Sequence, residues 1–184
     1  WATIIAGAGQ VNDDVDANLY GFYFAGTGGG PDTWAYNVRH IKTFDLSVIG
    51  SGNTISSSTY YCIGFSQGDP GGNDPTINVF PAQPAANNDL VTGDYSQTGN
   101  TAYSTAVTEA LFSTTATNTF TMNTAAVNQM QANIAGVFRF STKGDNDVSS
   151  TTPSFSTGDT MMNCSNADNA TANLRPKLTI TYAA

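Results

Sequence analysis

Very few side chains of this sequence could carry out acid–base or nucleophilic chemistry. The 184 residues include one histidine, His40, and one glutamate, Glu109. A Ser-His-acid triad would have to use His40, and no G-x-S-x-G elbow surrounds any serine. Two carboxylates could hydrolyse a glycoside, but no feature of the sequence pairs Glu109 with an aspartate. The sequence therefore predicts that the protein is not an enzyme and that His40 has a structural or surface role.

Asp145 and Asp147 are the residues best suited to bind a metal ion. With Asn146 between them, they offer hard oxygen ligands at alternating positions, as calcium prefers. The run lacks the remaining ligands of a calcium loop, including a glutamate at the right distance. The alternative is a turn rich in Asp and Asn. We expect no cofactor, with calcium at these two aspartates as the ion that the sequence could accommodate.

The two cysteines, Cys62 and Cys164, lie far apart in the sequence. In an oxidising compartment, a disulfide between them would close one long loop and stabilise the fold by about 3–5 kcal/mol. The alternative is two buried free thiols, because reduced cysteine behaves as a small hydrophobic residue. The sequence leaves both states open.

Carbohydrate could meet this chain in two ways. Trp34 and Tyr103 are aromatic residues near expected loops, where their rings could stack on sugars; the alternative is that they cap a sandwich core. The triplets that begin at Asn163 and Asn169 match the N-glycosylation pattern. Such triplets often arise by chance, so they add little to the case for an extracellular site. The sequence predicts glycan attachment at Asn163 and Asn169.

The composition excludes several classes of partner. Six Lys and Arg residues stand against 14 Asp and Glu, so the net charge is −8. Nucleic acid requires clustered Lys and Arg, and an anionic membrane surface would repel this charge. No apolar run approaches the length of a membrane span. The low-charge surface, rich in Ser, Thr, Asn and Gly, is typical of secreted proteins, so we expect an extracellular, cell-surface or virion-surface location.

Short strands separated by turn residues dominate the pattern. The closing run 177–182 alternates apolar Leu178, Ile180 and Tyr182 with polar residues, which predicts a strand with one buried face. Residues 59–65 are apolar on both parities, which predicts a central strand covered on both faces. Further strands are expected at 19–24, 36–46, 76–80, 119–122, 137–140 and 160–164, an irregular stretch at 81–117 and a polar loop at 143–152. The predicted fold is all-β, a jelly roll or β-sandwich of two antiparallel sheets, with at most one short helical turn near 124–131.

The N-terminus differs from the rest of the chain. Residues 1–9 are apolar and uncharged, and a polar run with three aspartates follows at 12–16. We therefore divide the chain into an N-terminal segment with its linker, 1–16, and a single β-sandwich domain, 17–184. An apolar strand on a polar tether is what strand addition between subunits requires, with Trp1, Ile4 and Ile5 as subunit contacts. The alternative is that this segment is the first strand of the chain's own sandwich. Because the chain begins at Trp1 rather than Met, we expect its N-terminus to be processed or trimmed.

The order of motifs in residues 36–182 resembles a known family. Residues 39–47 read RHIKTFDLS, residues 93–95 read GDY, residues 136–141 read GVFRFS and residues 175–182 read RPKLTITY. This order is similar to jelly-roll modules named for a DNRLRE motif. These modules are related to carbohydrate-binding modules and recur in secreted bacterial and archaeal surface proteins and in viral structural proteins. The resemblance implies a non-catalytic module that binds polysaccharide or serves as a surface scaffold.

Two functions agree with these expectations. The first is a non-enzymatic extracellular structural protein, a self-assembling jelly-roll subunit of a cell-surface filament, a fibre or a virion surface element. Its partner would be another copy of the chain in a homopolymer, joined by N-terminal β-strand addition. The second is a carbohydrate-binding or adhesion module whose partner is a polysaccharide. Neither function involves nucleic acid or insertion into a membrane.

Overall fold

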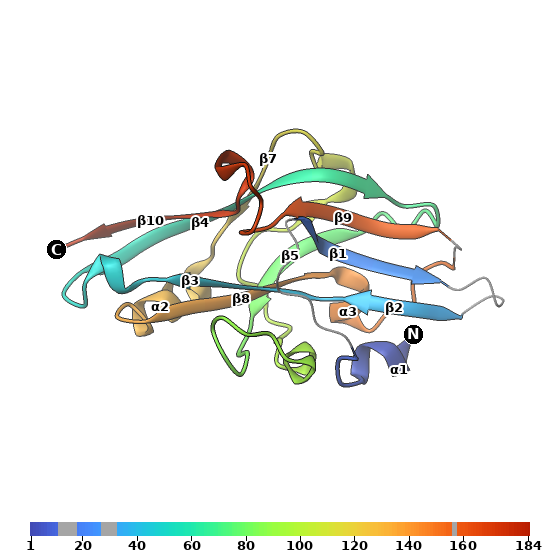
Figure 1. The fold of residues 1–184 in the computed structure, drawn as a ribbon, viewed down its shortest axis with the longest axis horizontal. Helices are drawn as coiled ribbons and strands as arrows, with labels where there is room; N and C mark the ends of the chain where they lie inside the picture. Colours follow the sequence, from blue (N-terminus) through green and yellow to red (C-terminus); the bar gives the residue numbers. More distant parts are fainter. Residues whose placement is uncertain (11–17, 27–32, 156–157) are drawn as a thin grey trace.

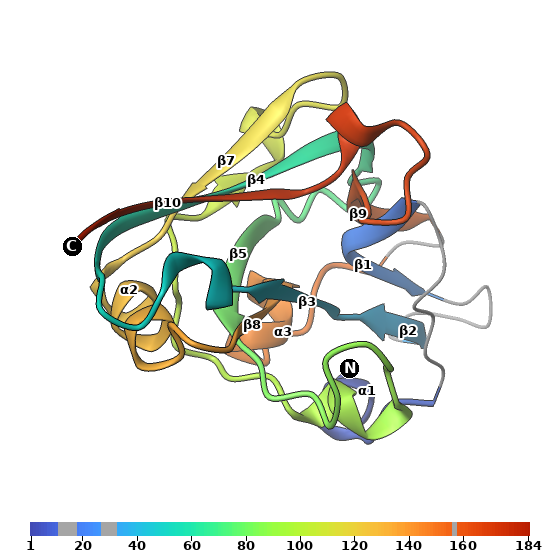
Figure 2. The same cartoon turned by 60° about the vertical axis from the view of Figure 1, so that its left-hand side comes forward.

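Antiparallel strands form the framework of the protein. The computed structural model describes residues 1–10, 18–26, 33–155 and 158–184, and for 18–26 it describes the backbone alone. The strands build two facing sheets. In Figures 1 and 2, β10, β4 and β9 of one sheet lie above β3 and β8 of the other. The predicted all-β sandwich of two antiparallel sheets is confirmed.

The larger sheet has six strands, in the order β10-β4-β9-β1-β2, with β7 also paired to β4. Along the chain these are β1 (Asn18–Gly26), β2 (Trp34–Val38), β4 (Thr54–Gly68), β7 (Thr117–Thr121), β9 (Asp159–Ser165) and β10 (Lys177–Ala183). Thr59 of β4 lies opposite both Thr179 and Thr121, so this strand is central, as expected. It is not covered on both faces, because the face with Tyr61, Ile63 and Phe65 is only partly buried and Phe65 is 42% exposed. β10 is the closing strand, and Tyr182 on it is 48% exposed.

The smaller sheet has four strands, in the order β3-β8-β5-β6. They are β3 (His40–Asp45), β5 (Thr76–Pro81), β6 (Val107–Thr108) and β8 (Val137–Gly144). Residues 36–46, predicted as one strand, are divided between β2 of the larger sheet and β3 of the smaller sheet. Arg39 lies at the crossing point. Because the chain changes sheets there, neither parity of this run is uniformly apolar.

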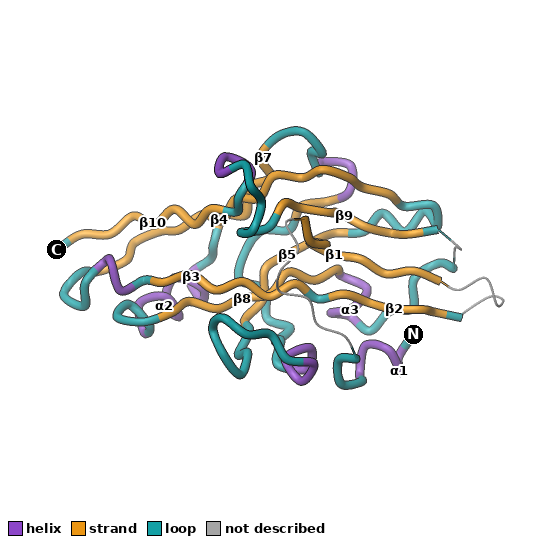
Figure 3. Tube along the Cα trace, in the orientation of Figure 1, coloured by secondary structure: helices purple, strands orange, loops and turns teal. Residues whose placement is uncertain are grey.

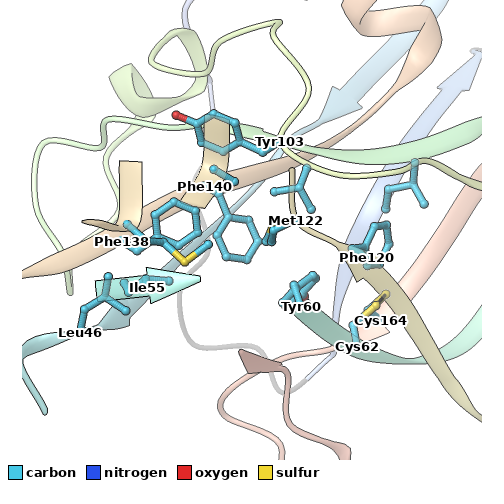
Figure 4. Packing of buried hydrophobic residues seen from close by; sticks show 14 of the residues in the cluster. Leu46, Ile55, Tyr60, Cys62, Tyr103, Phe120, Met122, Phe138, Phe140 and Cys164 are labelled. Carbon is cyan, nitrogen blue, oxygen red and sulfur yellow. Dashed lines mark hydrogen bonds between the residues drawn. The ribbon is translucent and has the colours of Figure 1, made fainter. Parts of the chain in front are cut away.

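Aromatic side chains from both sheets meet in the core. Tyr60 of β4 contacts Phe140 of β8 edge to face, with 4.9 Å between ring centroids, and its ring lies 5.5 Å from that of Phe120 on β7. Figure 4 shows this group together with Phe138 and the sulfur atoms of the two cysteines. Alternating residues of each strand supply these side chains, as expected when one face of each sheet is buried.

In the described part of the chain, three short α-helices and four 3₁₀ turns lie outside the sheets (Figure 3). The predicted helical turn is α2 (Thr124–Ala132), whose N-cap Asn123 accepts a hydrogen bond from the amide of Ala126. α2 contacts β4 and β8 and so covers one end of the sandwich. The irregular stretch contains η2 (Thr92–Ser96) and η3 (Glu109–Leu111), and the others are η1 (Ser47–Ile49) and η4 (Ala172–Leu174).

Two predictions of local structure were wrong. The N-terminal segment contains a helix, α1 (Ala2–Ala6), where a strand was expected. The expected polar loop at 143–152 contains the end of β8 and the helix α3 (Asp145–Ser149), so the fold has more helix than the single turn predicted. None of the helices among the described residues is long and apolar enough to cross a membrane.

Candidate docking site for the N-terminal segment

One face of α1 packs onto the sandwich. Trp1, Ile4 and Ile5 have the i, i+3, i+4 spacing of a helical face, and Ile5 is buried. The Trp1 ring meets Trp34 of β2 edge to face, with centroids 5.3 Å apart. Trp34 packs in the same way on Phe155, at 5.7 Å. The N-terminal segment therefore rests on an aromatic surface formed by distant parts of its own chain.

Arg39, at the crossing between the sheets, joins this segment to the domain. Its Nη2 donates a hydrogen bond to the carbonyl oxygen of Ile5, at 2.9 Å. Its Nη2 and Nε also donate to the two carboxylate oxygens of Asp147, both at 2.7 Å. The guanidinium lies 4.0 Å from the centroid of the Tyr95 ring, and Nη1 donates to the Tyr95 carbonyl. One side chain thus connects α1, α3 and η2.

Tyr95 completes the contact with the backbone of α1. Its hydroxyl donates to the carbonyl oxygen of Ile4 at 3.4 Å and accepts a hydrogen bond from Asn37 Nδ2 at 2.9 Å. The same Asn37 amide donates to Asp147. The indole N–H of Trp1 donates to the carbonyl of Asn146, at 3.3 Å. The segment is therefore held by hydrogen bonds to its main chain as well as by apolar packing.

The ion pair beneath the segment is shielded from water. The side chains of Arg39 and Asp147 are 9% and 1% exposed. Burial lowers the pKa of Arg39, but the hydrogen bonds and charge of Asp147 outweigh it and raise the pKa overall. Burial raises the pKa of Tyr95, so its hydroxyl stays protonated and able to donate. Removing one partner of such a pair typically costs about 3–5 kcal/mol, because the other charge is left buried.

Gly9 brings the end of the segment into close contact with η2. A Cβ atom at this position would lie 2.2 Å from the carbonyl oxygen of Thr92 and 2.8 Å from Cβ of Tyr95. No side chain fits at that distance, so the absence of a Cβ is what allows the backbone to approach. We use "docking site" for Trp34, Arg39, Tyr95, Asn146 and Asp147, which hold residues 1–9.

The docking site binds a peptide segment of its own chain. It offers hydrogen-bond donors to two consecutive carbonyls, an aromatic surface and a close backbone contact. Its ionisable groups are engaged with one another. Within the described ranges, no group of three His, Cys, Asp or Glu side chains could hold a metal ion.

The predicted site residues differ in their outcome. Trp1, Ile4 and Ile5 do lie together, although on a helix that contacts its own domain; their role between subunits stays a prediction. The calcium expectation is not supported, because both oxygens of Asp147 accept hydrogen bonds from Arg39, while Asp145 accepts one from the amide of Thr76. The linker at 12–16 lies within residues 11–17, outside the described residues.

The residues predicted to stack on glycans are buried. Trp34 is 9% exposed, and Tyr103 is 7% exposed and stacks on Phe138 in the core. Those two assignments were wrong, and the alternative of core aromatics holds. Both rings lie on inward-facing positions that the sequence pattern had not distinguished from loop positions.

The predicted glycan attachment sites are also enclosed. Asn163 lies on β9, is 3% exposed and donates to Ser66 Oγ at 2.9 Å. Asn169 is 9% exposed, and its Oδ1 accepts a hydrogen bond from the amide of Thr171. A glycan on Asn163 would have to displace these contacts from the sheet, so the structure argues against attachment there, and burial disfavours it at Asn169.

The two cysteines meet in the core. Their Sγ atoms are 2.8 Å apart, both residues are buried, and both are free thiols in this structure. The structure thus has the second of the two predicted states, in positions from which a disulfide could form.

The sequence reasoning missed the residues that hold the segment. Arg39 and Asp147 are 108 positions apart, and no local pattern links them. The spacing of Trp1, Ile4 and Ile5 was the one signal that could have revealed the helical face.

Comparison of the chain with protein-family models and with curated proteins gave no match.

Proposed function

We propose that this chain is a non-enzymatic structural subunit of an extracellular assembly, such as a cell-surface filament, a fibre or a virion surface element. In such an assembly, residues 1–9 of one copy would occupy the docking site of the next copy. The jelly-roll-like sandwich would be the repeating body, and the N-terminal segment would be the connector.

The observation that carries this proposal is how the segment is bound. α1 is attached through the carbonyls of Ile4 and Ile5 and through the ring of Trp1, by the side chains of Arg39, Tyr95 and Trp34. It adds no strand to a sheet. A segment that docks onto a separate site of its own fold can make the same contacts with an identical chain, which is the basis of domain swapping.

If each copy inserts its segment into the next copy, the repeated contact favours a filament over a closed dimer. A segment that leaves its own domain and enters the next makes a head-to-tail contact, and such contacts build rings or open chains. The resemblance of residues 36–182 to modules of secreted surface proteins and viral structural proteins supports the same class of function.

Deletion of residues 1–9 tests the proposal. We expect the shortened chain to stay folded and monomeric, while the full chain forms higher assemblies in size-exclusion chromatography and negative-stain images. A synthetic peptide of residues 1–9, added in excess to the full chain, is expected to occupy docking sites and shorten the assemblies. A peptide of the same length in which Ile5 and Ala6 are replaced by Asp serves as the control.

The peptide competition does not depend on the stability of the deletion variant. Assemblies of unchanged length with both peptides would count against segment exchange. A full chain that remains monomeric over a wide range of concentration would exclude self-assembly under those conditions and leave no basis for the proposal.

Carbohydrate binding is the second candidate, and one surface feature favours it. A pocket of about 600 Å³ lies on the outer face of the larger sheet, lined by Tyr61, Asn173, Arg175, Lys177 and neighbouring residues. An aromatic ring beside polar side chains is a suitable surface for a sugar. Retardation on polysaccharide affinity gels should then be lost in Tyr61→Ala and kept in Tyr36→Ala, which removes an exposed tyrosine elsewhere. If no polysaccharide retards the chain, this candidate is excluded.

A further inference from the structure

A pair of thiols lies inside the sandwich. Cys62 is on β4 and Cys164 on the adjacent strand β9, where it pairs with Gly64. Both side chains point into the core, their exposed fractions are 2% and 1%, and the Sγ atoms are 2.8 Å apart (Figure 4). The two sulfurs are therefore already in contact across neighbouring strands, from diagonal positions of the ladder.

A buried base from the opposite sheet lies beside the ring of Tyr60, whose side chain hydrogen-bonds Cys62. Lys42 on β3 is 6% exposed, and its Nζ is 5.8 Å from the centroid of the Tyr60 ring. Its hydrogen-bond partner is His40, another base. Burial lowers the pKa of Lys42 to about 8, while its attraction to the sulfurs of Cys164 and Cys62 acts in the opposite direction.

Lys42 has no carboxylate counter-ion among the described residues. No Asp or Glu of the described residues forms an ion pair with it. A buried ammonium requires a compensating negative charge, and the nearby groups able to supply one are the thiols. A hydrogen bond from Cys164 lowers the pKa of Cys62; burial raises it, and Lys42 lowers it further. Cys62 is thus the thiol suited to ionise.

We propose that Cys62 and Cys164 form a reversible dithiol–disulfide site whose reduced form is stabilised by Lys42. In the reduced form, the Cys62 thiolate would be the counter-ion of the Lys42 ammonium. In the disulfide neither sulfur is charged, so Lys42 loses that partner. Stabilisation of the reduced form raises the reduction potential of a disulfide, so this disulfide is easier to reduce than an ordinary structural one.

The oxidant is a small-molecule disulfide, which exchanges with the two cysteines in two steps. The Cys62 thiolate attacks one sulfur of the reagent, whose S–S bond breaks and releases one thiolate. Cys164 then loses its proton and attacks the sulfur of Cys62 in the mixed disulfide, which releases the second thiolate. Two electrons pass to the reagent. Its two thiolates take up two protons, one from Cys164 and one from the Lys42 ammonium, which has lost its anionic partner. Because both sulfurs are buried, exchange takes place during local opening of the sheet.

Equilibration of the full chain with glutathione buffers tests the site. After acid quenching and alkylation, intact-mass analysis gives the fraction of disulfide at each ratio of reduced to oxidised glutathione. We expect Lys42→Met to increase the equilibrium constant for disulfide formation up to about tenfold, which moves the midpoint by about 30 mV toward reducing potentials.

Lys143→Met is the matched control. Lys143 is also a buried lysine whose pKa is lowered by burial to about 8, but its Nζ lies 5.0 Å from the Phe80 ring and donates to Asn100. We expect its midpoint to equal that of the wild-type chain. Equal shifts in both variants would overturn the role of Lys42, and a cysteine pair that stays reduced at every ratio would overturn the site itself.

A measurement on the unmodified chain covers the case in which Lys42→Met does not fold. The reduced, folded chain at neutral pH should show the ultraviolet absorbance of a thiolate, and unfolding at the same pH should remove it. If folding produces no thiolate absorbance, the proposed ion pair does not exist.

Discussion

Several basic side chains of this protein lie inside the fold, where bases are costly. His40, Lys42 and Lys143 are 6%, 6% and 1% exposed. Burial disfavours the charged form of each of them, and Lys42 adds to this effect at His40 by charge repulsion. The folded state therefore binds fewer protons at these residues than the unfolded chain does, and its stability depends on pH.

His40 gives the clearest pH dependence. Burial, and then the charge of Lys42, hold its pKa well below 6.5, while Asn166 acts weakly in the opposite direction. The unfolded chain takes up a proton below pH 6.5 and the folded chain does not, so stability is fully present above pH 6.5 and decreases as pH falls. We expect a decrease of up to about 1.4 kcal/mol per pH unit between pH 6.5 and 5, measured by urea unfolding.

His40→Gln is the control for this pH dependence. Ordinary carboxylates titrate mainly below pH 5, and the chain has no second histidine, so the variant should show a flatter profile between pH 5 and 6.5. An unchanged slope in the variant would assign the pH dependence to other groups.

At the scale of elements, α1 is a helix that owes its conformation to its surroundings. It has five residues, and its N-cap Trp1 makes no side-chain capping bond. Isolated helices of this length are unstable in water. The contacts of Arg39, Tyr95 and Trp34 therefore keep this segment helical, and any change that removes them should release it.

Gly9→Ala is expected to weaken the docking of the segment. The added methyl group would overlap the Thr92 carbonyl, and overpacking of this kind typically costs about 1–3 kcal/mol. Hydrogen exchange at the amides of Ile4 and Ile5, which bond to the Trp1 carbonyl, should become faster. Gly93→Ala, on η2 itself, adds a methyl group with nothing within 4 Å and should leave these rates unchanged. Equal rates in both variants would show that the close contact at Gly9 does not hold the segment.

The elements differ in how far the sequence could predict them. The strands at 59–65 and 177–182 were predictable as strands from their β-branched, aromatic and alternating residues. The burial of 59–65 was not, because its continuous apolar run indicated two covered faces and only one is buried. α1 was not, because an Ala- and Ile-rich segment suits a strand as well as a helix and distant residues decide between them. The docking site was also unpredictable, since Arg39 and Asp147 meet only after the sheets form. Lys42 had a usable signal, because it shares a parity with Phe44 and Leu46 and so pointed inward.

At the scale of the whole molecule, the distribution of charge limits how copies can meet. Of the six Lys and Arg residues, Arg39, Lys42 and Lys143 are largely enclosed, whereas 14 acidic residues give the chain its net charge of −8. Two of the remaining bases, Arg175 and Lys177, line the pocket on the larger sheet. Identical acidic surfaces repel one another, so contacts between copies require apolar packing and main-chain hydrogen bonds of the kind found in the docking site.

The antiparallel ladder between β10 and β4 has a mechanical consequence. It runs through all seven residues of β10, from Lys177 opposite Tyr61 to Ala183 opposite Thr54. The two termini lie toward opposite ends of the long axis of the molecule (Figure 1). Interstrand hydrogen bonds are perpendicular to the strands. Tension along β10 therefore loads the whole ladder in shear, so its bonds must yield together rather than open one after another. A subunit pulled through β10 would resist force along the whole length of this ladder.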